Sequence, residues 1–115
     1  MSNTSTYILS WDCYGLESCI NATELEQQRI MNILGDKDQS RDENINQIVN
    51  LMTLRARFNS QRRYEIYAID VDENICHDDI VQSFKHNPQG AAELVRSLGR
   101  KIYSDREDPS SIKIR

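Results

Sequence analysis

The sequence predicts a small α+β domain in which a mainly antiparallel three-stranded sheet is packed with about four helices. Two segments, 7–13 and 64–72, have the composition and periodicity of strands, and four longer segments repeat apolar residues at helical spacing. These elements, with a short second strand, follow one another in the order ββααβαα. The chain has 115 residues, so we expect one domain over residues 1–115, with flexible ends at 1–6 and 105–115.

Residues 7–21 are predicted to form a β-hairpin. Leu9, Trp11 and Cys13 share one face of the first strand, because side chains alternate between the two faces of a strand. Gly15 lies in the turn that follows, where its freedom to adopt positive φ is useful. The chain then returns as a short second strand.

Two helices are expected next. The first begins at Thr23, which with Glu26 matches a capping box, and it ends near Gly35. The second runs from about residue 43 to residue 58. Its apolar stripe is broad, which indicates burial on more than one side, so we expect this helix to be central to the core. A polar loop separates the two helices.

Residues 64–72 give the strongest strand signal in the chain. Both faces of this segment are largely apolar, which indicates a strand in the middle of a sheet rather than one with a face in water. One face carries Tyr64, Ile66 and Ala68, and the other carries Tyr67, Ile69 and Val71.

Two further helices are predicted at about residues 77–86 and 88–103. Asn87 is expected to cap the second of these, with Pro88 at its first helical position. The last helix has a stripe of five apolar residues that we expect to be buried, namely Ala91, Leu94, Val95, Leu98 and Ile102.

Charge is distributed unevenly along the chain. The formal net charge is −4, with three basic against eight acidic residues in residues 1–54 and eleven against ten in residues 55–115. A protein dedicated to duplex DNA usually has a basic domain, because neutralising phosphates supplies much of its affinity. The overall balance argues against that class, but a local basic patch is still able to bind a phosphate or an acidic partner.

The chain shows no targeting or membrane signal. Its polar N-terminus lacks a basic region followed by an apolar core, and no apolar run approaches the length of a bilayer span. We therefore expect a cytoplasmic protein with no membrane association. Its three cysteines, an odd number, are expected to be reduced.

Six arginines are the candidate partner-binding residues. Four of them fall within nine residues at the expected end of the second helix, where arginine also suits the helix dipole and the last carbonyl groups. The alternative is a recognition patch for phosphate or carboxylate, since arginine offers a planar fork of donors. The other two are expected on the outward face of the last helix, where Glu93 can pair with one of them. The six residues are Arg55, Arg57, Arg62, Arg63, Arg96 and Arg100.

Two weaker constellations suggest metal chemistry. Asp70, Asp72 and Glu73 end the central strand and offer oxygen ligands of the kind that Mg²⁺ prefers, although a solvated strand end followed by an acid-rich helix start explains them fully. Cys13, Cys19 and the Cys76-His77 pair include zinc-ligating residue types, but the spacing of the first two cysteines is wider than usual. The sequence contains no phosphate-binding glycine loop, paired Cys-x-x-Cys or nucleophile elbow, so we predict no cofactor, resident metal or catalytic residue.

The two strand segments Tyr7–Asp12 and Tyr64–Asp70 resemble the uncharacterised small proteins that tailed phages encode. The resemblance implies an accessory protein acting in the cytoplasm of an infected bacterium, and it supplies no site residues. From the residues themselves we expect a non-enzymatic adaptor that binds protein, with a homodimer as one way to cover the edges of a small sheet. The alternatives are a nucleic-acid-binding protein that uses the same arginines and a metal-dependent enzyme that uses Asp70, Asp72 and Glu73.

Overall fold

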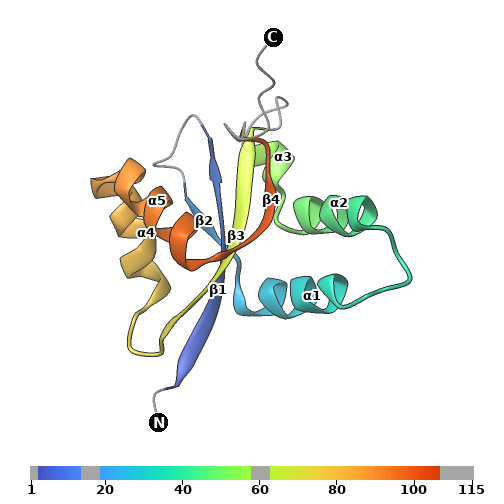
Figure 1. The fold of residues 1–115 in the computed structure, drawn as a ribbon, viewed down its shortest axis with the longest axis horizontal. Coiled ribbons are helices and arrows are strands. Elements are labelled where there is room, and N and C mark those ends of the chain that lie inside the picture. The colour runs from blue at the N-terminus through green and yellow to red at the C-terminus, as the bar shows by residue number, and fades with distance from the viewer. Residues whose placement is uncertain (1–2, 14–18, 58–62, 107–115) are drawn as a thin grey trace.

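The computed structural model describes residues 3–13, 19–57 and 63–106, apart from the side chain of His77. Within these residues it confirms the α+β class. In chain order the elements are β1 (Thr4–Asp12), β2 (Ile20–Asn21), α1 (Glu24–Leu34), α2 (Arg41–Leu51), α3 (Leu54–Arg57), β3 (Tyr64–Asp72), α4 (His77–His86), α5 (Pro88–Leu98) and β4 (Arg100–Ser104) (Figure 1). β1 begins inside the segment 1–6, and most of the expected C-terminal end lies outside the described residues.

The sheet is antiparallel throughout and has the strand order β2-β1-β3-β4. β1 and β3 pair along their whole length, from Thr4 opposite Asp72 to Asp12 opposite Tyr64. The prediction that residues 64–72 form a central strand is confirmed, because β3 has a neighbour on each side. The predicted hairpin is confirmed as the β1–β2 pair, while its turn at residues 14–18 lies outside the described residues.

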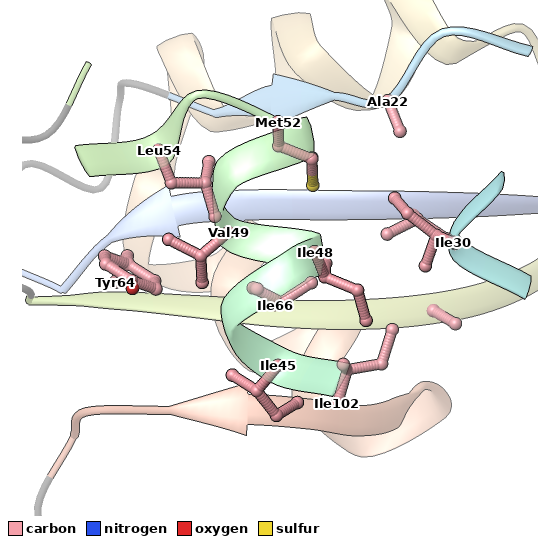
Figure 2. Packing of buried hydrophobic residues seen from close by; sticks show 12 residues of the cluster. Ala22, Ile30, Ile45, Ile48, Val49, Met52, Leu54, Tyr64, Ile66 and Ile102 are labelled. Carbon is pink, nitrogen blue, oxygen red and sulfur yellow. The ribbon is translucent and has the colours of Figure 1, made fainter. Parts of the chain in front are cut away.

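Helices cover both faces of the sheet (Figure 1). On one face, α1, α2 and α3 bury Ile30, Ile48 and Leu54 against Ile66 (Figure 2). Ile8 of β1 belongs to the same buried cluster. On the other face, α4 and α5 bury apolar side chains against Leu9, Trp11 and Tyr67. β1 and β3 contribute to both cores because successive side chains point to opposite faces.

The first two helices are positioned by side-chain caps. Thr23 and Glu26 form the predicted capping box: the Glu26 amide donates to Thr23 Oγ1 at 3.2 Å, and the Thr23 amide donates to Glu26 Oε1 at 2.8 Å. Ser40 caps α2 by accepting a hydrogen bond from the Glu43 amide at 3.2 Å. Such caps pair backbone amides that have no partner within the helix.

The single helix expected over residues 43–58 is interrupted after α2. Thr53 has φ of 54°, the left-handed region that side chains rarely adopt, and α3 begins at the next residue. Met52 and Leu54 on either side are both buried. The break therefore lets both side chains reach the core, and the cost of the strained residue is offset by that packing.

The segment 100–104 is a fourth strand rather than the end of the last helix. α5 stops before Gly99, where an added Cβ would lie 2.7 Å from Ile69 Cγ2 and 2.9 Å from the Ala68 carbonyl oxygen. Gly99 thus permits the close approach of the chain to β3, after which β4 pairs with that strand. Ile102 is buried as predicted, but from a strand.

Gly99→Ala is expected to lower the free energy of unfolding by about 1–3 kcal/mol, because the new methyl group overlaps atoms of β3. Urea denaturation followed by circular dichroism measures the change. Gly35→Ala is the matched control, since its Cβ would meet only ordinary contacts, the nearest at 3.5 Å. Equal stability of the two variants would contradict a packing role for Gly99.

Candidate functional site

Three of the predicted site residues gather at one end of the sheet. Arg55 and Arg57 lie on α3, and Arg63 directly precedes β3. α3 lies beside the start of β3 and the end of β4, at the top of Figure 1. We call Arg55, Arg57 and Arg63 the arginine end. The fourth residue of the sequence cluster, Arg62, lies outside the described residues.

The guanidinium of Arg55 is held by two amide side chains of α2. Its Nη1 donates to Asn50 Oδ1 at 2.8 Å, and its Nη2 donates to Asn46 Oδ1 at 2.9 Å. Asn46 and Asn50 are one helical turn apart, so they lie on the same side of α2. In the part of the chain that the structure describes, no carboxylate forms an ion pair with Arg55, and its Nε is buried without a hydrogen-bond partner. Arg55 is therefore held in a fixed orientation without a counter-charge among the described residues.

Arg55 lines a cavity of about 240 Å³ together with Asn46 and two aromatic side chains. The rings of Tyr64 and Tyr103 are 5.4 Å apart between centroids. Asp105 links these two residues, because its carboxylate accepts hydrogen bonds from the Tyr103 hydroxyl and from the Tyr64 amide. The complete lining is Asp42, Ile45, Asn46, Arg55, Tyr64 and Tyr103. The guanidinium of Arg55 supplies donors for a small carboxylate-bearing group, while Asp42 adds a negative charge to the same lining.

Arg57 and Arg63 are exposed around Arg55. Arg57 Nε donates to Thr53 Oγ1 at 3.4 Å, which is again a neutral partner. The Arg63 carbonyl accepts a hydrogen bond from the Cys13 amide at 2.7 Å, and this bond fixes its backbone at the end of the β1–β3 ladder. Arg55 and Arg57, whose hydrogen-bond partners among the described residues are neutral, thus lie at the same end of the sheet as Arg63.

Arg96 points into the protein, which corrects the expectation of an outward position paired with Glu93. Its Nη2 lies 2.5 Å from Glu65 Oε2, and its Nε donates to Glu65 Oε1 at 3.3 Å. The Glu65 side chain is 1% exposed and that of Arg96 is 18% exposed. Trp11 Nε1 and Ser104 Oγ also donate to this carboxylate, at 2.8 Å and 3.1 Å. Glu65 was missed in the sequence, although a single acid among apolar strand residues was the available signal.

The pKa of Glu65 reflects opposing effects. Burial alone would raise this pKa, but the hydrogen bonds and charge of Arg96 lower it, with help from Trp11 and Ser104, and the net pKa lies below its usual 4.5. Burial likewise acts to lower the pKa of Arg96, and Glu65 outweighs that effect and raises it. Both groups are therefore charged near neutral pH.

Arg100 is also neutralised within the protein. It lies at the start of β4 rather than on a helix, and its Nη1 is 2.7 Å from Asp70 Oδ2. Hydrogen bonds from Thr6 and then from Arg100 lower the pKa of the Asp70 carboxyl. The six candidate arginines thus do not form one surface. Arg96 and Arg100 have carboxylate partners, whereas the partners of Arg55 and Arg57 within the described ranges are neutral.

The acidic end of β3 binds its own neighbours. Asp70 accepts hydrogen bonds from Thr6 and Arg100, and Asp72 Oδ1 accepts one from the Asn74 amide at 2.9 Å. Among the described residues, no group of three or more histidine, cysteine, aspartate or glutamate side chains is placed to hold a metal ion. The geometry that a magnesium site at Asp70, Asp72 and Glu73 requires is not assembled there.

The three cysteines are free thiols. Burial, followed by the nearby negative charge of Glu65, raises the pKa of Cys13 to about 12. Burial raises the pKa of Cys19 to about 12 as well. Cys76 is exposed and lies just before α4. Because the thiolate is the reactive form, Cys13 and Cys19 are poor nucleophiles and poor metal ligands while the protein is folded.

No protein-family model, curated protein or solved structure matches this chain. Within the described residues, no helix has both the length and the apolar character needed to cross a bilayer.

Glu65→Gln is expected to lower the free energy of unfolding at neutral pH by about 3 kcal/mol, because it leaves Arg96 partly buried without a counter-charge. The lowered pKa of Glu65 also contributes stability that is present above about pH 4.5 and is lost as the pH falls through the folded-state value. The free energy of unfolding, measured with denaturant between neutral and acidic pH, should therefore decrease less with falling pH in the variant than in the wild type.

The control for that experiment is Glu93→Gln, which removes an exposed acid from the same helix as Arg96. This control should leave both the stability and its pH dependence close to those of the wild type. If Glu93→Gln and Glu65→Gln behave alike, the buried ion pair does not stabilise the fold.

Cys76 is expected to react first with a thiol reagent in the folded protein, because it is exposed and the other two thiols have a raised pKa. Mass spectrometry after brief labelling at neutral pH identifies the modified residue. Labelling in denaturant should modify all three at similar rates. Rapid labelling of Cys13 or Cys19 in the native protein would contradict the protection of these thiols by the fold.

Proposed function

We propose that this chain is a non-enzymatic adaptor of the cytoplasm, and that its arginine end binds an acidic segment of a protein partner. One observation supports this above the others. Arg55 is oriented by Asn46 and Asn50 and has no carboxylate partner in the described part of the chain. Its charge is available to an external carboxylate, unlike that of Arg96 and Arg100.

The amide contacts prepare Arg55 for binding. A free arginine side chain loses rotamer entropy when it forms an ion pair, and two hydrogen bonds to one helix have already restricted Arg55. A half-buried cation without a counter-charge is also costly for the isolated protein. A carboxylate from a partner removes that cost, so the binding energy and the orientation both favour an acidic group at this position.

The surroundings of Arg55 favour a carboxylate over nucleic acid. Asp42 also lines the cavity, and its carboxylate limits how much negative charge the cavity accepts. Tyr64 is only 2% exposed, so its ring is not open to stacking with a base. The chain's net charge of −4 further opposes a polyanion. We therefore place the nucleic-acid function second, with the same arginines as its contacts.

The charge on the rest of the protein supports an oriented encounter. The arginine end lies at the start of β3, and the acids Asp72 and Glu73 lie at or beyond its other end, where Asp70 is already paired with Arg100. Separated basic and acidic groups of this kind help to orient an acidic partner before contact. An accessory role inside an infected bacterium is compatible with such an adaptor and is part of this proposal.

Arg55→Gln is expected to weaken binding to a fluorescent peptide rich in aspartate and glutamate by roughly tenfold to a hundredfold, as expected for the loss of one charge-assisted hydrogen-bonding group. Arg57→Gln should have a smaller effect because Arg57 is more exposed. Fluorescence anisotropy at low salt measures both affinities. Arg29→Gln, at an exposed position on α1, is the charge-matched control and should bind like the wild type.

Single-stranded and double-stranded DNA of matched length serve as competing probes in the same assay. Tighter binding to either DNA, with affinity that falls steeply as salt rises, would favour the nucleic-acid alternative. Wild-type protein that binds neither the acidic peptide nor DNA at low salt would contradict both. Affinity capture from the host lysate, read by mass spectrometry in wild type and Arg55→Gln, would identify the natural partner.

A further inference from the structure

An exposed apolar surface lies away from the arginine end, on α5 and the chain before α4. Leu94 and Leu98 of α5 are 58% and 67% exposed, and Ile75 is 40% exposed. These three residues border an apolar hollow of about 270 Å³ between β3, α4 and α5. Exposed leucines are common individually, but three large apolar side chains around one hollow indicate a contact surface.

A second hollow of about 450 Å³ lies between α4 and α5. Gly90, Ala91 and Ser83, which have small side chains, form part of its lining. Leu94 borders both hollows. The same surface therefore carries projecting leucines and a recess bordered by small residues. We call Ile75, Leu94, Leu98 and these two hollows the α5 face.

The sequence pattern of α5 supports the same conclusion. Its apolar stripe predicted burial of Ala91, Leu94, Val95 and Leu98 together. The domain buries Ala91 and Val95 and leaves Leu94 and Leu98 exposed. The domain thus covers only part of the apolar stripe of α5, and the uncovered part is able to pack against a second partner.

We infer that the α5 face binds the α5 face of a second copy of this chain, related by a two-fold axis. A two-fold interface requires one surface to be complementary to itself, and the α5 face carries both the leucines and the recess. Two polar side chains agree with this arrangement, because a carboxylate is able to accept a hydrogen bond from an imidazole N–H. Asp79 and His86 both border the hollow between α4 and α5 and lie at opposite ends of α4. A two-fold axis across α4 places Asp79 of each copy near His86 of the other.

The sheet edges are less suited to this contact. Arg41 Nη2 donates to the Ile102 carbonyl at 3.1 Å, so part of the outer edge of β4 is already bonded to α2. The other edge strand, β2, has only two residues. The dimer inferred here is therefore one of helices packed face to face, and it leaves the arginine end free for another partner.

Sedimentation velocity of the wild-type full chain, measured over a range of protein concentrations, tests the inference directly. The sedimentation coefficient should rise with concentration from that of a monomer to that of a dimer. A single monomeric species at every concentration would overturn the inference without any variant. Arg55→Gln should dimerise like the wild type, which separates this result from the acidic-peptide assay.

Leu94→Glu and Leu98→Glu locate the interface. Each is expected to raise the dissociation constant of the dimer at least roughly tenfold, because the substitution occurs in both copies. Leu25→Glu is the matched control, since Leu25 on α1 is 58% exposed, as Leu94 is. Leu25→Glu should dimerise normally. If the control dissociates the dimer and the two α5 variants do not, the interface lies elsewhere and the inference fails.

The proposed contact between Asp79 and His86 has its own test. His86→Asp should weaken the dimer by placing an acid near Asp79 of the other copy, and Asp79→Lys with His86→Asp should restore it by placing a positive and a negative charge at the two positions. Circular dichroism melting confirms that each variant is folded, since Asp79 also accepts a hydrogen bond from the Cys76 amide at 3.4 Å. If His86→Asp, which does not alter that bond, leaves the dimer unchanged, the proposed two-fold arrangement is wrong.

Discussion

The buried carboxylate of Glu65 is the constraint on which much of this structure depends. A negative charge within an apolar core is tolerated only when donors surround it. Here the donors come from three other elements: Trp11 of β1, Arg96 of α5 and Ser104 of β4. One side chain thus fixes how a central strand, its two neighbours and a covering helix meet. Arg96 also lies 5.8 Å from the centre of the Trp11 ring, which adds a cation–π contact to the same cluster.

Internal pairing also divides the arginines of this protein into two groups. Arg96 neutralises Glu65 and Arg100 neutralises Asp70, so both arginines contribute to the fold. Arg55 sits on the opposite face of the sheet from that cluster, held by two neutral amides. Residues of one type therefore differ in their partners. Arg96 and Arg100, which pair with carboxylates, support the fold, whereas Arg55, which bonds to amides, is the arginine for which we propose an external acidic partner.

The helices on the two faces of the sheet also differ in what they leave exposed. α2 buries Ile45, Ile48 and Val49 on one side, and its amide side chains on another side orient Arg55. α5 covers the other face with Ala91, Ala92 and Val95 and still presents two leucines outward. The proposed acidic contact and the inferred dimer contact therefore use separate surfaces. Neither contact requires a change in the core that supports the other.

Local interactions explain what the sequence by itself determined: the α+β class, the β1–β2 hairpin, the central strand β3 and the capped start of α1. The alternation in β1, the two apolar faces of β3 and the Thr23–Glu26 box each depend on residues close together in the chain. Only the tertiary structure decided that residues 100–104 form β4, that Thr53 ends the long helix and that Arg96 turns inward to Glu65. Those outcomes depend on contacts between distant segments: β4 needs the edge of β3, and Arg96 needs an acid 31 residues away. The same reason separates Arg55 from Arg96, because the sequence shows which residues are basic and the fold decides which charges are already paired.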